Sequence, residues 1–507
     1  MRNGRGQRAV GYWLLAVCYW LMPSLAQAQD SLATKLTYDL TTEANIGSGD
    51  YTAYQLVSNR HHVVGTRSNT AYLRGALKLE HTFKNGLSLS SVVDAIGSVH
   101  ADHKVYLQQC YVDLSSKSFT LEIGSREEAP ILRHAELSSG AFAKGINAKP
   151  IPQIQIRTNG FRPIPKTKGW LEYNFGFGYG IFLDGGYREK QFEEAQEANN
   201  KYATGILYHQ KHLYFRSNPE KLFFAMVGIE HAVQFCGSSY TKQGGGLIEK
   251  RKPVVLKSFW NVILPLGDSN YFSNEAMEDW VYGNHLGSMT IQLGWNINKE
   301  HLVQAYVDDI FEDGSGIRKG NGWDGLWGIQ YTNKAKGHQL VRGAVIEYFQ
   351  STNQSGPLHW DGGDYPEPYR HQIKDYITGN DNYYNHGFYV SYTQYGMSMG
   401  TPLIPSPRYN KDGYNEFRDN RIKAWHLGVE GEINERLSYL IKGSYRDGWG
   451  TYWLPLPTKH HSFDALLMGR YQVGAWNFSA AYAFDKGNIY GDNSTFNIKI
   501  GYHGKIL

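Results

Sequence analysis

Residues 119–124 read Phe119-Thr120-Leu121-Glu122-Ile123-Gly124, and they carry the pattern that decides the fold. Every second side chain is apolar, and the others are polar or absent. Because successive side chains of a β-strand point to opposite faces, this alternation predicts a strand with one apolar and one polar face. A polar loop follows, and then a second alternating run, Gln153-Ile154-Gln155-Ile156-Arg157. Two prolines stand just before this run, which fits the start of a strand better than its interior.

The same alternation recurs along the chain in segments of about ten residues, the length of a tilted strand that crosses a bilayer. The clearest examples are residues 71–80, 289–297, 477–485 and 496–502. We count about eighteen to twenty candidate strands, a range set by the uncertainty of strand boundaries. No apolar run approaches the roughly 20 residues that a membrane helix requires.

Length and composition agree with a large β protein. The chain has 507 residues, too many for one ordinary globular core, and contains no Pro-rich or Ser-rich linker that would divide it. It is rich in Tyr (37), Trp (13) and Gly (56), with a mean hydropathy of −0.48. This balance is typical of a turn-rich β protein with aromatic rings at a membrane interface. The chain therefore has either hidden domain boundaries or one large closed fold.

The connections between candidate strands come in two sizes. Short ones include residues 84–86, where Asn85-Gly86 supplies the positive φ of a tight hairpin, and residues 115–118, 298–300, 434–436 and 474. Long ones cover residues 126–149, 237–252, 265–284, 351–382 and 448–461. Short turns at one end and long loops at the other predict an outer-membrane β-barrel whose long loops face the exterior. Closure also removes exposed strand edges.

One segment does not fit this order. A strand near residues 384–395 would be followed by the long, Pro-rich residues 396–421, on the side where turns should be short. This segment either hides a further strand or folds into the lumen.

The N-terminus predicts export. Three arginines precede an apolar run that ends in Ala26-Gln27-Ala28, so residues 1–28 are interpreted as a signal peptide; a retained membrane anchor is the alternative. Removing them leaves 48 of the 51 basic residues against 47 acidic ones, which gives no support for nucleic acid binding. We expect residues 29–67 to form an N-terminal periplasmic or plug segment and residues 68–507 to form the barrel. Cys110 and Cys236 remain after cleavage, and their spacing leaves open whether they form a disulfide.

Several short motifs, in order along nearly the whole mature chain, resemble the Wzi-type capsule assembly proteins, in the form found in Bacteroidetes-like Gram-negative bacteria. They include Ser58-Asn59-Arg60, Gln108-Gln109-Cys110-Tyr111, Ile123-Gly124-Ser125-Arg126-Glu127, Leu137-Ser138-Ser139-Gly140, His231-Ala232-Val233-Gln234-Phe235, Asp324-Gly325-Leu326-Trp327-Gly328, Asn382-Tyr383-Tyr384-Asn385, Gly400-Thr401-Pro402-Leu403 and Gly450-Thr451-Tyr452.

The resemblance implies an outer-membrane barrel of eighteen strands with a plugged lumen. It also implies a lectin-like protein, without catalysis or cofactor, that binds capsular polysaccharide and supports capsule assembly or surface attachment. Its other expected partners are outer-membrane lipid and, during biogenesis, the barrel-assembly machinery. The motif Leu137–Gly140 would either brace the loop that contains it or contact sugar.

A lectin requires flat rings that stack on sugars and carboxylates or amides that bind hydroxyl groups. The predicted loops offer candidate polysaccharide-binding residues: Trp323, Asp324, Trp327, Trp360, Asp361, Tyr383, Tyr384, Trp449 and Tyr452. Taken singly, each ring is also explained by the aromatic girdle of a barrel. Their grouping in loops favours binding.

The sequence also suggests two other functions and contains one run that resembles a metal site. A barrel of this size could be a channel for solutes or saccharides, because sixteen or more strands can enclose an aqueous pore. A hydrolase is a remote alternative, suggested by His460-His461-Ser462, whose spacing places one histidine and the serine on the same strand face. A metal site at residues 308–314 is not expected, because Phe311 occupies a ligand position of the calcium loop that this run superficially matches.

Overall fold

The structure is a computed structural model that describes residues 31–101, 104–195, 198–264, 282–312, 314–317, 319–355 and 381–507. The predicted signal peptide, residues 1–28, lies outside the described residues, as do Trp360 and Asp361. Among the described residues, no helix has the length and apolar character needed to cross a membrane.

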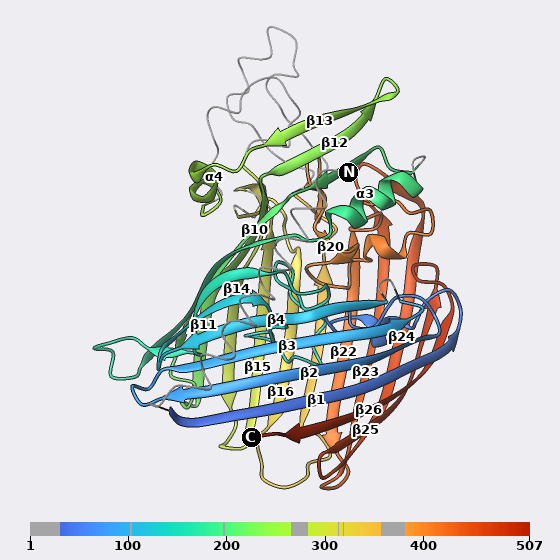
Figure 1. Ribbon diagram of the computed structural model, residues 1–507. Coiled ribbons are helices and arrows are strands. Elements are labelled where there is room, and N and C mark those ends of the chain that lie inside the picture. Colours follow the sequence, from blue (N-terminus) through green and yellow to red (C-terminus); the bar gives the residue numbers. More distant parts are fainter. Residues whose placement is uncertain are drawn as a thin grey trace.

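The chain forms a closed antiparallel β-barrel of eighteen strands, which confirms the predicted fold class (Figure 1). The sheet contains nineteen strands, but the two-residue strand β7, Arg162–Pro163, only pairs with β8 beside β6. Twelve residue pairs between β1 and β26, from Thr37↔Lys505 to Ser48↔Ser494, close the barrel. The barrel strands are β1 Ser31–Ser48, β2 Thr70–Phe83, β3 Ser88–Val99, β4 Val105–Ser115, β5 Phe119–Ser125, β6 Gln153–Thr158, β8 Leu171–Ile181, β10 Leu207–Ser217, β11 Phe223–Phe235, β14 Asn284–Asn296, β15 His301–Phe311, β16 Gly325–Asn333, β17 Gly343–Gln350, β22 Ile422–Glu432, β23 Leu437–Gly450, β24 Pro455–Val473, β25 Trp476–Gly487 and β26 Asn493–Lys505.

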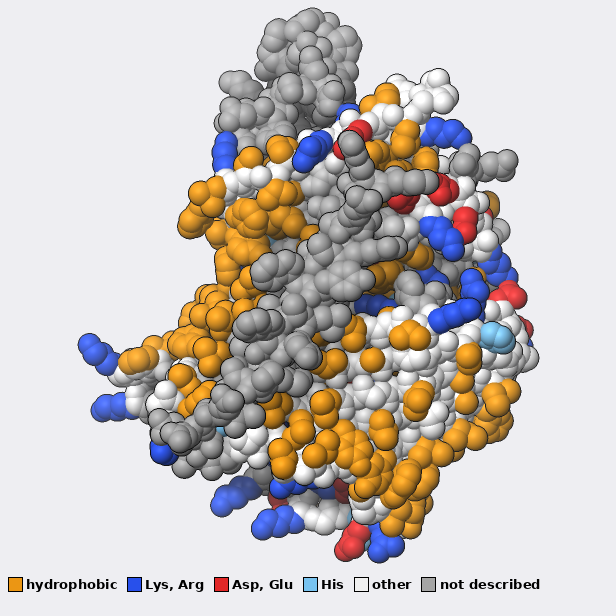
Figure 2. Space-filling view, in the orientation of Figure 1, with side chains coloured by type: hydrophobic (Ala, Val, Ile, Leu, Met, Phe, Trp, Pro, Cys, Tyr) orange, Lys and Arg blue, Asp and Glu red, His pale blue; other side chains and the backbone are white. Residues whose placement is uncertain are grey.

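The wall is apolar outside and polar inside, the reverse of a soluble barrel. In β14, Ile291 and Leu293 are 57% and 59% exposed, whereas the alternate side chains of Thr290 and Gln292 are buried. Figure 2 shows hydrophobic side chains spread over the wall and most charged side chains near the ends of the barrel. This pattern is that of a barrel whose outer surface lies in lipid.

The two ends of the barrel differ. At the short-turn end, where the C-terminus also lies, β2–β3, β4–β5, β14–β15, β22–β23 and β24–β25 are joined by tight turns (Figure 1). Gly86 has the expected positive φ, 83°, in the first of these. The remaining elements stand at the opposite, long-loop end or fold inside the wall: α2 Tyr54–Val57, α3 Gly185–Glu194, β9 Lys201–Thr204, β12 Gly237–Gln243, β13 Gly246–Lys252, α4 Leu256–Asn261, α5 Gly314–Ile317, β18 Asn385–His386, β19 Val390–Ser391, β20 Thr393–Gln394, β21 Met397–Ser398 and the 3-10 turn η4 Pro407–Tyr409.

The predicted N-terminal segment is wrong in its first part. Within residues 29–67, Ser31–Ser48 forms the barrel strand β1, so the barrel begins before residue 68. Leu40 and Ile46 face outward, and Glu43 and Asn45 are buried on the inner face. Residues 36–41 alternate between apolar and polar side chains, but Thr42 and Ala44 occupy the next outward positions and shorten the clear alternation.

The expected strand near residues 384–395 is also absent. These residues form parts of the two-stranded hairpins β18–β19 and β20–β21, inside one long connection between β17 and β22. Residues 396–421 belong to the same connection, and most of their side chains are buried. They fold into the lumen, which was one of the two alternatives. Residues 448–461 are not a loop, because β23 and β24 continue to Gly450 and from Pro455.

Three connections fold inside the wall: residues 49–69, 126–152 and 381–421. Their aromatic and aliphatic side chains form the main core together with side chains on the inner faces of the barrel strands. Tyr384 donates a hydrogen bond to the carbonyl oxygen of Phe142 (2.7 Å), and Tyr392 donates one to that of Ala143 (2.7 Å). The second and third segments are therefore bound to each other. That they close the lumen to solutes stays a prediction.

Candidate functional site

Four predicted binding residues lie at the long-loop end, Trp323 and Trp327 near the start of β16 and Trp449 and Tyr452 near the end of β23, and Tyr452 contacts the segment of residues 352–354. Trp323 is 71% exposed and Trp327 half-buried, with ring centroids 5.4 Å apart. Across the segment, the hydroxyl group of Tyr452 donates to the carbonyl oxygens of Thr352 and Asn353 at 3.1 and 3.0 Å. The guanidinium of Arg421 lies 4.0 Å from the Tyr452 ring centre.

Trp449 stands beside Tyr452 at the end of β23, half-buried, with the ammonium groups of Lys423 and Lys459 about 6 Å from its ring centre. We call Trp323, Trp327, Trp449 and Tyr452 the rim rings. Trp323 offers an accessible ring face, and Trp449 and Tyr452 have cations beside their rings, so these rings can stack on sugars. Trp360 and Asp361 follow the same segment in sequence.

Three predicted residues do not reach a ligand outside the protein. Tyr383 and Tyr384 are fully buried in the core, so neither ring can stack on an external sugar. Asp324 is also buried, and its carboxylate accepts hydrogen bonds from the backbone N–H groups of Asn353 (3.0 Å) and Gln354 (2.7 Å). Burial raises the pKa of Asp324, and these backbone hydrogen bonds oppose the shift. The sequence marked these residues correctly as polar or aromatic but could not show that they hold the loops together.

A second group of residues, missed by the sequence analysis, forms a cleft at the same end. This long-loop cleft has a volume of about 250 Å³ and lies between α3, η4 and the segments before β2 and after β19. Its lining combines three aromatic rings, four cations and several amides, and it contains no carboxylate: Tyr51, Tyr187, Tyr202, Arg67, Arg188, Arg408, Lys411, Gln191, Asn410 and Asn415, among others.

The cations of the cleft differ in how they are held. Arg188 is buried and bound by Asp184 (2.9 Å), whereas Arg67 is exposed and makes no ion pair within the described residues. Arg408 lies 5.2 Å from the ring centre of Tyr187. Burial and the neighbouring Arg67 lower the pKa of Arg408 to about 10, so this guanidinium is still charged at neutral pH. The cleft therefore presents positive charge beside ring faces.

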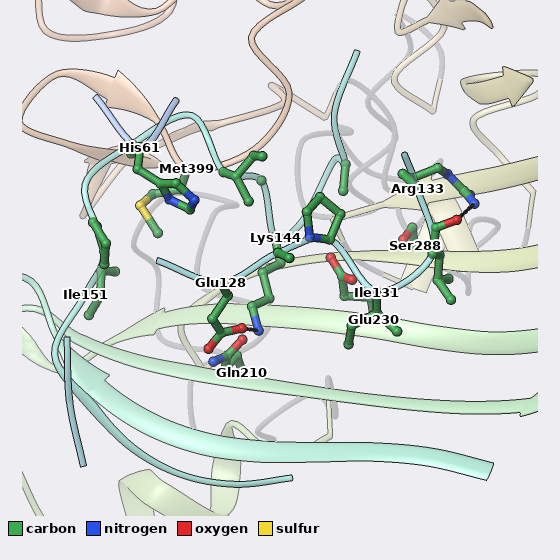
Figure 3. A pocket seen from close by; sticks show the side chains of 18 of the residues that line it. His61, Glu128, Ile131, Arg133, Lys144, Ile151, Gln210, Glu230, Ser288 and Met399 are labelled. Atoms are coloured by element: carbon green, nitrogen blue, oxygen red, sulfur yellow. Dashed lines mark hydrogen bonds and ion pairs between the residues drawn. The ribbon is translucent and has the colours of Figure 1, made fainter. Parts of the chain in front are cut away.

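A smaller cavity of about 80 Å³ lies in mid-barrel between residues 126–151 and the inner faces of β10, β11, β14 and β15 (Figure 3). Lys144 forms an ion pair with Glu128, and Arg133 pairs with Asp308 of the wall. Although burial opposes the change, Lys144 lowers the pKa of Glu128. This mid-barrel cavity is too small for a sugar. The Arg133–Asp308 pair holds the inserted segment to the wall, and the Lys144–Glu128 pair lies within that segment.

A third cavity, of about 480 Å³, opens at the short-turn end. Among the described residues, no three His, Cys, Asp or Glu side chains are grouped so that they could hold a metal ion. Cys110 and Cys236 are both buried and form no disulfide with each other. The fully buried Ser462 lies on the inner face of β24, away from solvent.

In fold, the chain is similar to solved outer-membrane β-barrels. No family model and no curated protein sequence matches it. It is similar in fold to the Escherichia coli protein Wzi, described as a carbohydrate-binding β-barrel involved in group 1 capsule assembly, with a TM-score of 0.54 and 11% identity over 92% of this chain and 84% of Wzi. Two Pseudomonas aeruginosa outer-membrane proteins also match: OccK5 (TM-score 0.46, 9% identity, 95% and 100% of the two chains) and OprD (0.46, 8%, 95% and 96%).

Proposed function

We propose that this protein lies in the outer membrane and binds an extracellular or capsular polysaccharide at its long-loop end, where it supports capsule assembly or surface attachment. The observation that carries the proposal is the long-loop cleft, in which rings, amides and cations face one opening with no carboxylate among them. Rings stack on the apolar faces of sugars, and amides and guanidinium groups bind hydroxyl and acidic groups. The rim rings enlarge this surface.

The similarity to Wzi supports the proposal through the fold alone, since the two chains are 11% identical. The residue chemistry of the long-loop cleft is an independent support. The proposal includes no catalytic step, no cofactor and no nucleic acid partner.

Binding of purified polysaccharides to the detergent-solubilised protein tests the proposal. Replacement of Arg67 by Gln and of Tyr187 by Ala should together weaken binding by about tenfold or more, because a charge-assisted hydrogen bond and a stacking contact are lost. A matched control is Arg436→Gln, an exposed arginine in a turn at the opposite end. Equal binding by the cleft variant and the control, with both barrels intact, would contradict the proposal.

A channel is the second candidate function, and the wide polar cavity at the short-turn end favours it. A channel requires a water-filled path through residues 126–152 and 381–421. Conductance across a planar bilayer distinguishes the two functions. A large and steady conductance would support the channel, whereas a closed bilayer combined with polysaccharide binding would support the lectin.

A further inference from the structure

The cavity at the short-turn end is the largest of the three and has no assigned role. This short-turn cavity, of about 480 Å³, lies within the roughly 300–1,000 Å³ range of small-molecule sites. Its mouth is formed by the turn between β24 and β25 and by the end of β26. Its inner end is formed by residues 55–60 and by Ala135 and Glu136 of the inserted segments. Solutes from the short-turn side can therefore reach the inserted segments.

Most charges in this cavity are already paired. Arg60 makes two hydrogen bonds to the carboxylate of Glu43, at 2.8 and 2.6 Å. Arg470 makes two to Glu136, at 2.7 and 3.0 Å. At the mouth, His503 contacts Asp39 at 2.8 Å. The carboxylates of Glu43, Glu136 and Asp39 are therefore already engaged by Arg60, Arg470 and His503.

Two lysines are not paired. Lys442 of β23 and Lys499 of β26 both line the cavity, and within the described residues neither makes an ion pair or a side-chain hydrogen bond. Lys442 is only 8% exposed. The carboxylates that interact most strongly with the Lys442 ammonium group are those of Glu136 and Asp464. They form ion pairs with Arg470 and Arg446 instead. Glu43, near Lys499, is bound to Arg60.

A buried ammonium without a partner is costly, because it loses water without gaining an opposite charge. Much of the remaining lining is polar, with amide and hydroxyl groups that include Gln472, Asn477 and Ser479, and the aliphatic side chains of Leu440, Leu466 and Met468 form an apolar part of it. The polar part of the lining suits an oxygen-rich solute, and the two unpaired ammonium groups suit a negative charge on it.

We propose that the short-turn cavity binds a hydrophilic solute that carries an oxyanion, either a carboxylate or a phosphate, and that Lys442 and Lys499 provide the positive charge that holds it. The site lies at the opposite end of the barrel from the long-loop cleft, and it does not depend on the proposed polysaccharide function. It would serve a lectin or a channel equally.

Calorimetric titration of the purified full-length protein in detergent, with inorganic phosphate, glucuronate and neutral glucose as probes, tests the site. We expect saturable binding of phosphate or glucuronate, and no binding of glucose. Lys442→Gln combined with Lys499→Gln should raise the dissociation constant about tenfold or more, because charge-assisted hydrogen bonds are removed. Lys336→Gln, an exposed lysine in a turn at the same end, is the matched control and should change nothing.

The comparison of phosphate with glucuronate decides which oxyanion the site prefers. Failure of both anions to bind the wild-type protein, or equal affinity in the double variant and the control, would overturn the proposal. If the double variant does not assemble, the rate of lysine acetylation in the wild-type protein, measured with and without anion, tests the site instead. Saturating anion should slow the modification of Lys442 and Lys499 several-fold without protecting Lys336, and unchanged rates would refute the site.

Discussion

The barrel wall and the segments inserted into it are held together in different ways. Each wall strand bonds to its neighbour through the backbone, and most neighbours are consecutive in sequence. The inserted residues 126–152 instead depend on side-chain contacts with distant strands. Ser138 donates to Glu347 of β17, 209 positions away, and His426 of β22 bonds to the carbonyl oxygen of Leu137, 289 positions away.

This difference shows which part of the molecule requires particular residues at particular positions. A wall strand needs only alternation, since backbone groups pair with any neighbouring strand. An inserted segment needs particular polar partners on the inner face, because its buried groups would otherwise be unpaired. The contacts of the motif Leu137–Gly140 favour the bracing role over direct contact with sugar. The four predictions below test the contrast between wall and insert, from the largest expected effect to the smallest.

The largest effect is expected at Arg446, which is fully buried between the wall and the first inserted segment. It pairs with Asp464, donates to Tyr490 (2.8 Å) and lies 3.9 Å from the ring centre of Tyr54. Arg446→Leu leaves Asp464 buried without its cation and should lower the free energy of unfolding by about 3–5 kcal/mol. Thermal or urea unfolding in detergent measures this loss.

The matched control for Arg446 is the more exposed pair Lys459–Asp447 (3.0 Å), also between β23 and β24. Lys459→Leu should cost less than about 1 kcal/mol, because solvent screens the pair. Equal losses in the two variants would show that the buried contact adds nothing to assembly.

The next effect concerns Glu347, which accepts hydrogen bonds from Ser138 Oγ (2.8 Å), Ser139 N–H (2.7 Å) and Tyr306 Oη (2.5 Å). Glu347→Gln places an NH₂ group against one of these donors and should cost about 1–3 kcal/mol. Trypsin cleavage within residues 126–152 should accelerate while the barrel stays folded. Glu435→Gln in an exposed turn should leave cleavage unchanged, and an equal response of the two variants would contradict the bracing role.

A pH-dependent effect, smaller when taken over a single pH unit, is expected at Lys149 in the same insert. Burial lowers the pKa of Lys149 to about 7; its ammonium lies 3.3 Å from the ring centre of Tyr106 and 5.1 Å from that of Tyr395. Between pH 7 and about 10 the unfolded chain binds the proton and the folded chain does not, so stability should rise with pH by up to about 1.4 kcal/mol per unit. Below pH 7 this contribution levels off.

Lys149→Met should remove this rise in stability. Unfolding midpoints of the variant and the wild type, compared between pH 7 and pH 10, measure the difference. Parallel pH profiles would show that Lys149 is charged in the folded protein.

The smallest effect on stability is expected at the rim. Trp323 is largely exposed, so Trp323→Ala should change the free energy of unfolding by less than about 0.5 kcal/mol. Polysaccharide binding should nevertheless weaken by roughly two- to tenfold through loss of a stacking ring. Binding and unfolding measured on the same preparation separate the two. A large loss of stability without a loss of binding would assign this ring to the scaffold.

Sequence reasoning worked best where structure is local. Residues 119–124 and 289–297 alternate strongly, and they form β5 and most of β14. It failed at β1, where the clear alternation covers only residues 36–41, and at residues 384–395, where short buried hairpins have the aromatic composition of a membrane strand. It found the rim rings by residue type. It could not find the long-loop cleft, because Arg67, Tyr187 and Arg408 are far apart in sequence and have no motif in common.

By itself, the sequence determined a transmembrane antiparallel barrel of about eighteen to twenty strands with short turns at one end, because period-two alternation and turn residues act over a few neighbouring positions. Only the tertiary structure decided that β1 closes the barrel against β26 and that residues 126–152 and 381–421 fold inside. It also decided that Tyr383 and Tyr384 are core residues and that Lys442 and Lys499 face one cavity. These facts depend on which side chains meet across the lumen, and closure of the ring brings together residues that no local pattern connects.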